Sequence, residues 1–177
     1  MTAGEAAQVT AAWDRIRTWL RKHVPASYAT LQPGASPEEL DEVETVVGMS
    51  LPVGLQALWM CNNGSGGPMV WGDPEEEVVA RAFLPQGDTF VSAAAAKPLY
   101  LFNTSMEFYD RAWIPFAAYD PDGFTGLFVN AAPGDFHWRV GHWNHKDQTV
   151  PEGPLLSVWL KEAATALEQG QWAPPAL

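Results

Sequence analysis

Hydrophobic residues in the first third of the chain recur at the three- and four-residue spacing of an α-helix. This spacing predicts an amphipathic helix over residues 5–22 and a second helix over residues 35–48. Ser36 and Glu39 have the spacing of a capping box, which supports the start of the second helix. The segment 51–64 predicts a third, short helix, so three helices should precede any strand.

The pattern changes after a glycine-rich turn to short apolar runs that are typical of strands. Because no helical pattern separates these runs, they favour an antiparallel sheet. A final amphipathic helix is predicted from about residue 154 to residue 169. The runs that predict strands cover residues 69–71, 78–83, 98–102, 113–119, 123–130 and 136–143.

These elements predict an α+β fold in which the N-terminal helices and one C-terminal helix flank the sheet. The 177 residues, 47% of them hydrophobic and 18% charged, are enough for one folded domain. We expect this single domain to cover residues 1–170 and residues 171–177 to form a flexible tail.

The charge balance limits the partners that the chain could bind. It carries 10 lysine and arginine residues against 21 aspartate and glutamate residues, a formal net charge of −11. This field repels nucleic acid and anionic membranes, so we expect neither as a direct partner. The single cysteine excludes an intramolecular disulfide, and no apolar run reaches the ~20 residues of a membrane span. Because the N-terminus also lacks a signal-peptide pattern, we expect a cytoplasmic protein.

Residues that could carry out catalysis form no recognised motif. Cys61 is predicted at the C-terminal end of a helix, where the helix dipole disfavours a thiolate. His137, His142 and His145 could bind a metal ion in principle, but strand alternation would point His137 and His142 to opposite faces. We therefore predict no catalytic residue, no cofactor and no metal site. A small hydrolase that uses carboxylates stays open because the chain is so acidic.

Tryptophan is abundant, with nine residues in the chain. Those on the apolar faces of predicted helices are expected in the core: Trp13, Trp19, Trp59 and Trp159. Three others lie on or near turns and strand ends and could be exposed anchors for a partner: Trp71, Trp138 and Trp143.

Several motifs follow one another along the chain in a defined order. WDRIRTWL at residues 13–20 comes first and is followed by LQPGASPEELDEVETVVG at residues 31–48. LPVGLQALWMCNNG at residues 51–64 comes next. WIPFA at residues 113–117 and GLFVNAAPG at residues 126–134 then precede VGHW and the final helix. This ordered set resembles the Smi/Knr family of the SUKH superfamily, which includes fungal cell-wall-assembly regulators and many bacterial immunity proteins.

The resemblance implies a twisted antiparallel sheet with flanking helices, and a protein-binding role rather than catalysis. In bacterial relatives that role is to neutralise a cognate toxin, often a nuclease, by occluding it. The family usually has an acidic residue before the Pro-Gly turn, where this chain has Asn130. The role that the carboxylate plays in relatives is therefore open in this chain.

An acidic run that follows Trp71 has no obvious helix to cap and is interpreted as a loop. A toxin surface is usually basic, and complementary charge speeds the encounter of two proteins. We therefore place the partner-binding surface on this run and on a second acidic turn, with Trp71 as an anchor; the alternative is a loop that only confers solubility. The acidic residues of this predicted surface are Asp73, Glu75, Glu76, Glu77, Asp120 and Asp122.

The sequence thus supports three hypotheses from different classes. The leading one is a non-enzymatic cytoplasmic binding protein, an immunity protein that masks a basic toxin domain. A regulatory scaffold of cell-wall or polysaccharide synthesis is the alternative, and a small carboxylate-dependent hydrolase is the third.

Overall fold

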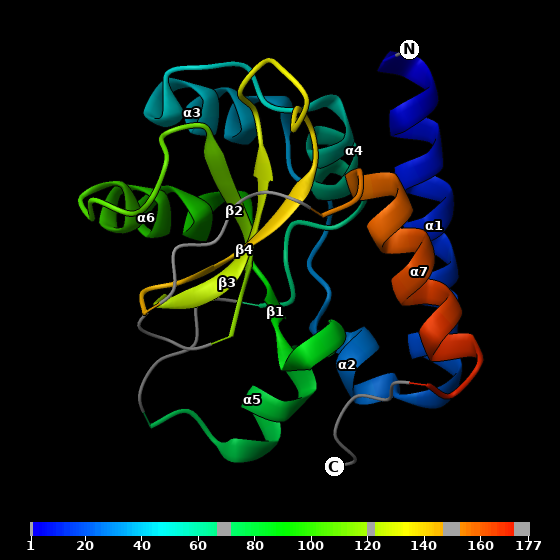
Figure 1. Ribbon diagram of the computed structural model, residues 1–177. Coiled ribbons are helices and arrows are strands. Elements are labelled where there is room, and N and C mark those ends of the chain that lie inside the picture. The colour runs from blue at the N-terminus through cyan, green and yellow to red at the C-terminus, as the bar shows by residue number, and fades with distance from the viewer. Residues whose placement is uncertain (1, 67–71, 120–122, 147–152, 172–177) are drawn as a thin grey trace.

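A four-stranded antiparallel sheet in the order β1-β2-β3-β4 lies at the centre of the fold (Figure 1). The computed structural model describes residues 2–66, 72–119, 123–146 and 153–171. The strands are β1 (Thr89–Phe90), β2 (Trp113–Ala118), β3 (Thr125–Asn130) and β4 (Val140–Asn144). The helices are α1 (Thr2–His23), α2 (Pro25–Thr30), α3 (Pro37–Val47), α4 (Val53–Cys61), α5 (Glu75–Arg81), α6 (Ala93–Thr104) and α7 (Leu156–Glu168).

The helices pack on both sides of this sheet. Figure 1 shows the paired helices α1 and α7 to the right of the sheet, with α4 beside α1, and shows α6 and α3 to its left. The small domain therefore has an α+β architecture, which confirms the predicted fold class. Within the described part of the chain, every helix is too short or too polar to span a lipid bilayer.

The long amphipathic helices agree with the sequence pattern. The prediction over residues 5–22 corresponds to α1, and the prediction at the C-terminus corresponds to α7. At the start of α3, Ser36 Oγ accepts a hydrogen bond from Glu39 N at 3.2 Å, and Glu39 Oε2 accepts one from Ser36 N at 2.8 Å. Gly48 ends α3 with φ 72°, a left-handed conformation that glycine adopts without a steric penalty.

Two runs that predict strands are helical, so those predictions are wrong. Residues 78–83 lie largely in α5, and residues 98–102 lie inside α6, which begins where Ser92 Oγ accepts a hydrogen bond from Ala95 N. A short apolar run without alternation has no periodicity that separates a strand from a buried helix. The short helix α2 and the two-residue strand β1 were not predicted, and residues 69–71 lie outside the described residues.

The core contains Trp143, which corrects its prediction as an exposed anchor. Its side chain is fully buried on β4, and its indole N–H donates a hydrogen bond to the Gly123 carbonyl at 3.0 Å. Gly126 pairs with Trp143 across β3 and β4, and a Cβ atom at Gly126 would lie 2.3 Å from the indole ring. The absence of a side chain at Gly126 therefore makes room for the ring. Trp13 and Trp59 are fully buried as predicted, whereas Trp19 and Trp159 are partly buried against the core.

One exposed ion pair joins the two ends of the chain. Arg15 on α1 donates to both carboxylate oxygens of Glu168 on α7, at 2.9 Å and 2.6 Å. The hydrogen bond from Arg15 lowers the pKa of Glu168 below its ordinary value of 4.5. A carboxylate with a lowered folded-state pKa stabilises the fold above its unfolded pKa, and this contribution is lost as the pH falls through the folded-state value.

We therefore expect Glu168→Gln to lower the free energy of unfolding at pH 7 by at most about 1 kcal/mol, because the pair is exposed to solvent. The difference in the free energy of unfolding between the variant and the wild type should shrink as the pH falls below 4.5, the ordinary pKa of a glutamate. Urea denaturation at neutral and acidic pH measures both quantities. Glu162→Gln is the control, because Glu162 is exposed on the same helix and has no ion pair among the described residues. An equal pH dependence in the two variants would contradict this prediction.

Candidate protein-binding surface

The acidic run of the predicted surface lies at the start of a helix rather than in a loop. Asp73 precedes α5, and the three glutamates occupy its first turn. Carboxylates are stabilised at this position by the positive end of the helix dipole. The interpretation of the run as a loop is therefore wrong, and its charges have a local structural role. All three glutamate side chains are nevertheless exposed to solvent: Glu75, Glu76 and Glu77.

Arg81, at the other end of α5, divides these carboxylates into two groups. Its guanidinium contacts Asp73 at 3.2 Å and Glu77 at 3.0 Å, and its side chain is only 17% exposed. Glu75 and Glu76 form no ion pair with any described residue. Two of the four acidic side chains of the run are therefore available to a partner.

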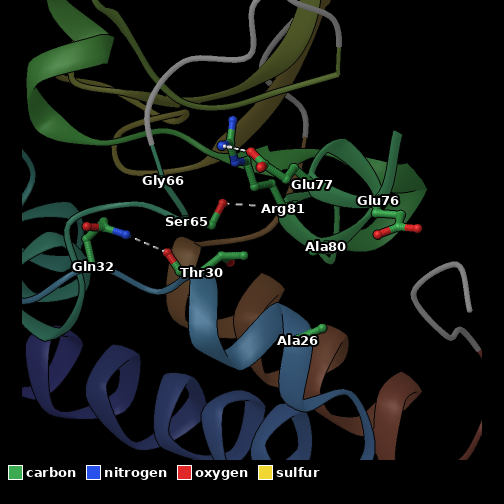
Figure 2. A pocket seen from close by; sticks show the side chains of 9 residues that line it. All are labelled: Ala26, Thr30, Gln32, Ser65, Gly66, Glu76, Glu77, Ala80 and Arg81. Carbon is green, nitrogen blue, oxygen red and sulfur yellow. Dashed lines mark hydrogen bonds and ion pairs between the residues drawn. The ribbon is translucent and has the colours of Figure 1, made fainter. Parts of the chain in front are cut away.

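A hollow of about 380 Å³ separates α5 from α2. Figure 2 shows Glu77 directed toward Arg81 and Glu76 directed away from it, with Thr30 on α2 across the hollow. Ser65 closes the inner side, where its hydroxyl donates to the Arg81 carbonyl at 3.2 Å. The residues that line the hollow are Ala26, Thr30, Gln32, Ser65, Gly66, Glu76, Glu77, Ala80 and Arg81.

A second hollow of about 380 Å³ adjoins the first, because both are lined by Gln32 and Gly66. Its lining is mostly polar and includes Glu39, whose carboxylate accepts hydrogen bonds from Ser36 N and Asn63 Nδ2. Together the two hollows form a polar groove between the α2–α3 connection and the segments that follow α4. The other residues that line the second hollow are Pro33, Gly34, Asn63 and Ser92.

The pairing of β1 with β2 brings Tyr119 to the edge of the molecule where α5 leads into β1. α5 leads through a short 3-10 turn to β1, and Thr89 of β1 pairs with Ala118 at the end of β2. A Cβ atom at Gly87 would lie 3.8 Å from the ring of Tyr119, which is 57% exposed and directly precedes Asp120 in the sequence. Tyr119 is an exposed aromatic side chain that sequence reasoning missed, although its place next to an acidic turn was a usable signal. The predicted site residues Trp71, Asp120 and Asp122 lie outside the described residues.

The loop between β3 and β4 holds the remaining tryptophan of the predicted anchors. Trp138 is half-buried and has φ 64°, an uncommon value for a bulky residue. The buried Asn130 holds this loop, since its Nδ2 donates to the Phe136 carbonyl and its Oδ1 accepts from Ala132 N, both at 3.1 Å. A carboxylate at this position could accept but could not donate. The Asn130 amide therefore holds the loop through one donated and one accepted hydrogen bond, which explains why asparagine rather than an acidic residue precedes the Pro-Gly turn in this chain.

The described histidine, cysteine and acidic residues form no group of three that could hold a metal ion. Cys61 is half-buried at the end of α4, and its Sγ lies 3.9 Å from the Thr10 hydroxyl. His137 packs against Trp138 in the loop, whereas His142 lies on β4.

These features define an α+β protein with an acidic, grooved surface. Residues 34–162 match the model of the SMI1 / KNR4 family (SUKH-1), and the chain belongs to this family. A comparison with curated proteins gives no match. Domains of the family generally bind protein partners and are generally non-enzymatic. Membership therefore supports a non-catalytic immunity or regulatory role in general.

Proposed function

We propose that this protein is an immunity protein that binds and masks the basic domain of a cognate toxin, such as a nuclease, in the cytoplasm. The observation that carries the proposal is the family match over residues 34–162, in a chain whose net charge is −11. A negative surface attracts a basic domain and repels other acidic proteins, so it favours one kind of partner. The lone Cys61 is consistent with a reducing compartment.

The contact surface that we propose contains the acidic run at α5 together with Trp71, Asp120 and Asp122. Within the run, the exposed and unpaired carboxylates of Glu75 and Glu76 support this assignment. The pairing of β1 with β2 also supports it, because it brings Tyr119 beside the turn that follows α5.

Co-expression with the product of a neighbouring toxin gene tests the proposal. We expect a complex and protection of the cell, and the absence of both would reject the proposal. Recovery of envelope-synthesis enzymes instead of a toxin would favour the regulatory scaffold. Turnover of a substrate that the amide variants of Asp120, Asp122 and Glu76 abolish would favour the hydrolase.

The association rate provides a quantitative prediction about the surface. With the toxin domain as partner, the double variant Glu75→Gln/Glu76→Gln should associate roughly three- to tenfold more slowly than the wild type at low salt. The control is Glu107→Gln/Glu162→Gln, which removes the same charge from two other exposed positions, one in the turn after α6 and one on α7. Stopped-flow fluorescence measures both rates. Equal slowing in the two double variants would place the contact surface elsewhere.

A further inference from the structure

The lining of the hollow between α2 and α5 carries two carboxylates, Glu76 and Glu77, against one guanidinium, Arg81. Glu76 lines it and has no ion pair with the described residues, and Gln32 donates its amide N–H to the Thr30 carbonyl at 2.8 Å. This leaves Gln32 Oε1 as an acceptor to which no described residue donates a hydrogen bond. The guanidinium of Arg81, which could donate, is already held by Asp73 and Glu77. The net charge of this lining is therefore negative, and a ligand that brings positive charge and hydrogen-bond donors complements it.

The shape of the hollow limits the size of such a ligand. Its volume of about 380 Å³ is at the lower end of ligand pockets, which suits one long side chain rather than a folded element. The adjoining hollow extends the polar groove past Gln32 and Gly66, so a chain segment could continue along it. An extended segment exposes its own backbone donors and acceptors to the polar side chains that line such a groove.

We propose that this groove receives an extended basic segment of the protein partner, with one lysine or arginine side chain in the hollow beside Glu76, while Gln32 lies at the other end of the hollow (Figure 2). The inference rests on the proposed function and names the subsite through which the partner is held. One wall is formed by Ala26, Thr30 and Gln32, which precede the family match at residue 34.

Charge removal at neighbouring positions tests the subsite. The probe is a fluorescein-labelled octa-arginine peptide, and fluorescence anisotropy at low ionic strength gives its dissociation constant. Glu76→Gln should weaken binding by about fivefold, because it removes a charged acceptor from the hollow. Glu75→Gln removes the same charge from the same helical turn, but Glu75 does not line the hollow. It should weaken binding by less than about twofold, since only long-range attraction is lost.

Steric closure provides a second test that leaves the charge unchanged. Ala26 and Ala29 are both exposed on α2, but only Ala26 lines the hollow. Ala26→Trp should weaken peptide binding at least as much as Glu76→Gln does, whereas Ala29→Trp should bind like the wild type. Thermal unfolding followed by circular dichroism shows whether each variant retains the fold.

The outcomes separate this inference from the proposed function. Equal weakening by Glu75→Gln and Glu76→Gln, with no effect of Ala26→Trp, would overturn the subsite but leave an immunity protein that binds by overall charge. Failure of the folded wild type to bind the peptide would also overturn the subsite. The co-expression experiment with the toxin then decides the proposed function independently.

Discussion

Replacing Trp143 with alanine is expected to lower the free energy of unfolding by roughly 3–5 kcal/mol. The indole is fully buried, and its ring meets Tyr109 edge to face with a centroid distance of 5.7 Å. The smaller side chain would leave a cavity next to Gly126, which has no side chain to fill it. It would also leave the Gly123 carbonyl without its indole donor. Urea denaturation followed by far-UV circular dichroism measures the loss.

Trp138→Ala is the matched control for this substitution. Trp138 is half-buried in a loop, and its ring lies 4.7 Å from the ring of the neighbouring His137, centroid to centroid. We expect this substitution to lower the free energy of unfolding by roughly 1 kcal/mol, which is typical of a substitution outside the core. If the two alanine variants were equally stable, Trp143 would not be the core residue that the structure places on β4.

Glu5→Ala should lower the free energy of unfolding by roughly 2–3 kcal/mol, because it leaves buried donors without an acceptor. Glu5 on α1 is only 8% exposed, and its carboxylate accepts hydrogen bonds from Ser157 N at 3.1 Å and from Ser157 Oγ at 2.8 Å. Ser157 lies in the first turn of α7, whose N-cap residue Leu155 provides no side-chain cap. A side chain from a distant helix therefore caps α7.

Two variants test this interpretation by chemical or thermal denaturation. Glu5→Gln keeps one acceptor for Ser157 and should lower the free energy of unfolding by less than Glu5→Ala does. Gln8→Ala changes an exposed position of the same helix, and its free energy of unfolding should stay within about 0.5 kcal/mol of that of the wild type. An equal loss for Glu5→Ala and Gln8→Ala would show that the contact with Ser157 does not stabilise the fold.

The secondary structure was predictable where a local signal marked it. The capping box at Ser36 and Glu39 and the left-handed Gly48 are local features, and α3 begins and ends at them. The strands β2 and β3 were also expected, because turn residues bound their apolar runs. In α5 and α6 the apolar runs are short, and packing rather than spacing decides that they are helical.

The candidate site was predictable in its chemistry but not in its geometry. The excess of acidic residues and the clustered run before Val78 were visible as charges along the chain. Whether a given carboxylate is available depends on its neighbours in space, and the pairing of Glu77 with Arg81 is a helical contact that a predicted loop does not contain. The groove joins residues from α2 with residues from α5, about 50 positions apart, so no local pattern marks it.

The α+β class, the long amphipathic helices, the acidic character and the family could be read from the amino-acid sequence, because they depend on composition, local spacing and ordered motifs. The burial of Trp143, the capping of α7 by Glu5 and the hollow between α2 and α5 appear only in the folded molecule. Each of these depends on contacts between residues far apart in the chain. Whether a side chain is buried or paired depends on how the molecule packs. A sequence pattern therefore predicts burial and pairing only when the partners are close in sequence.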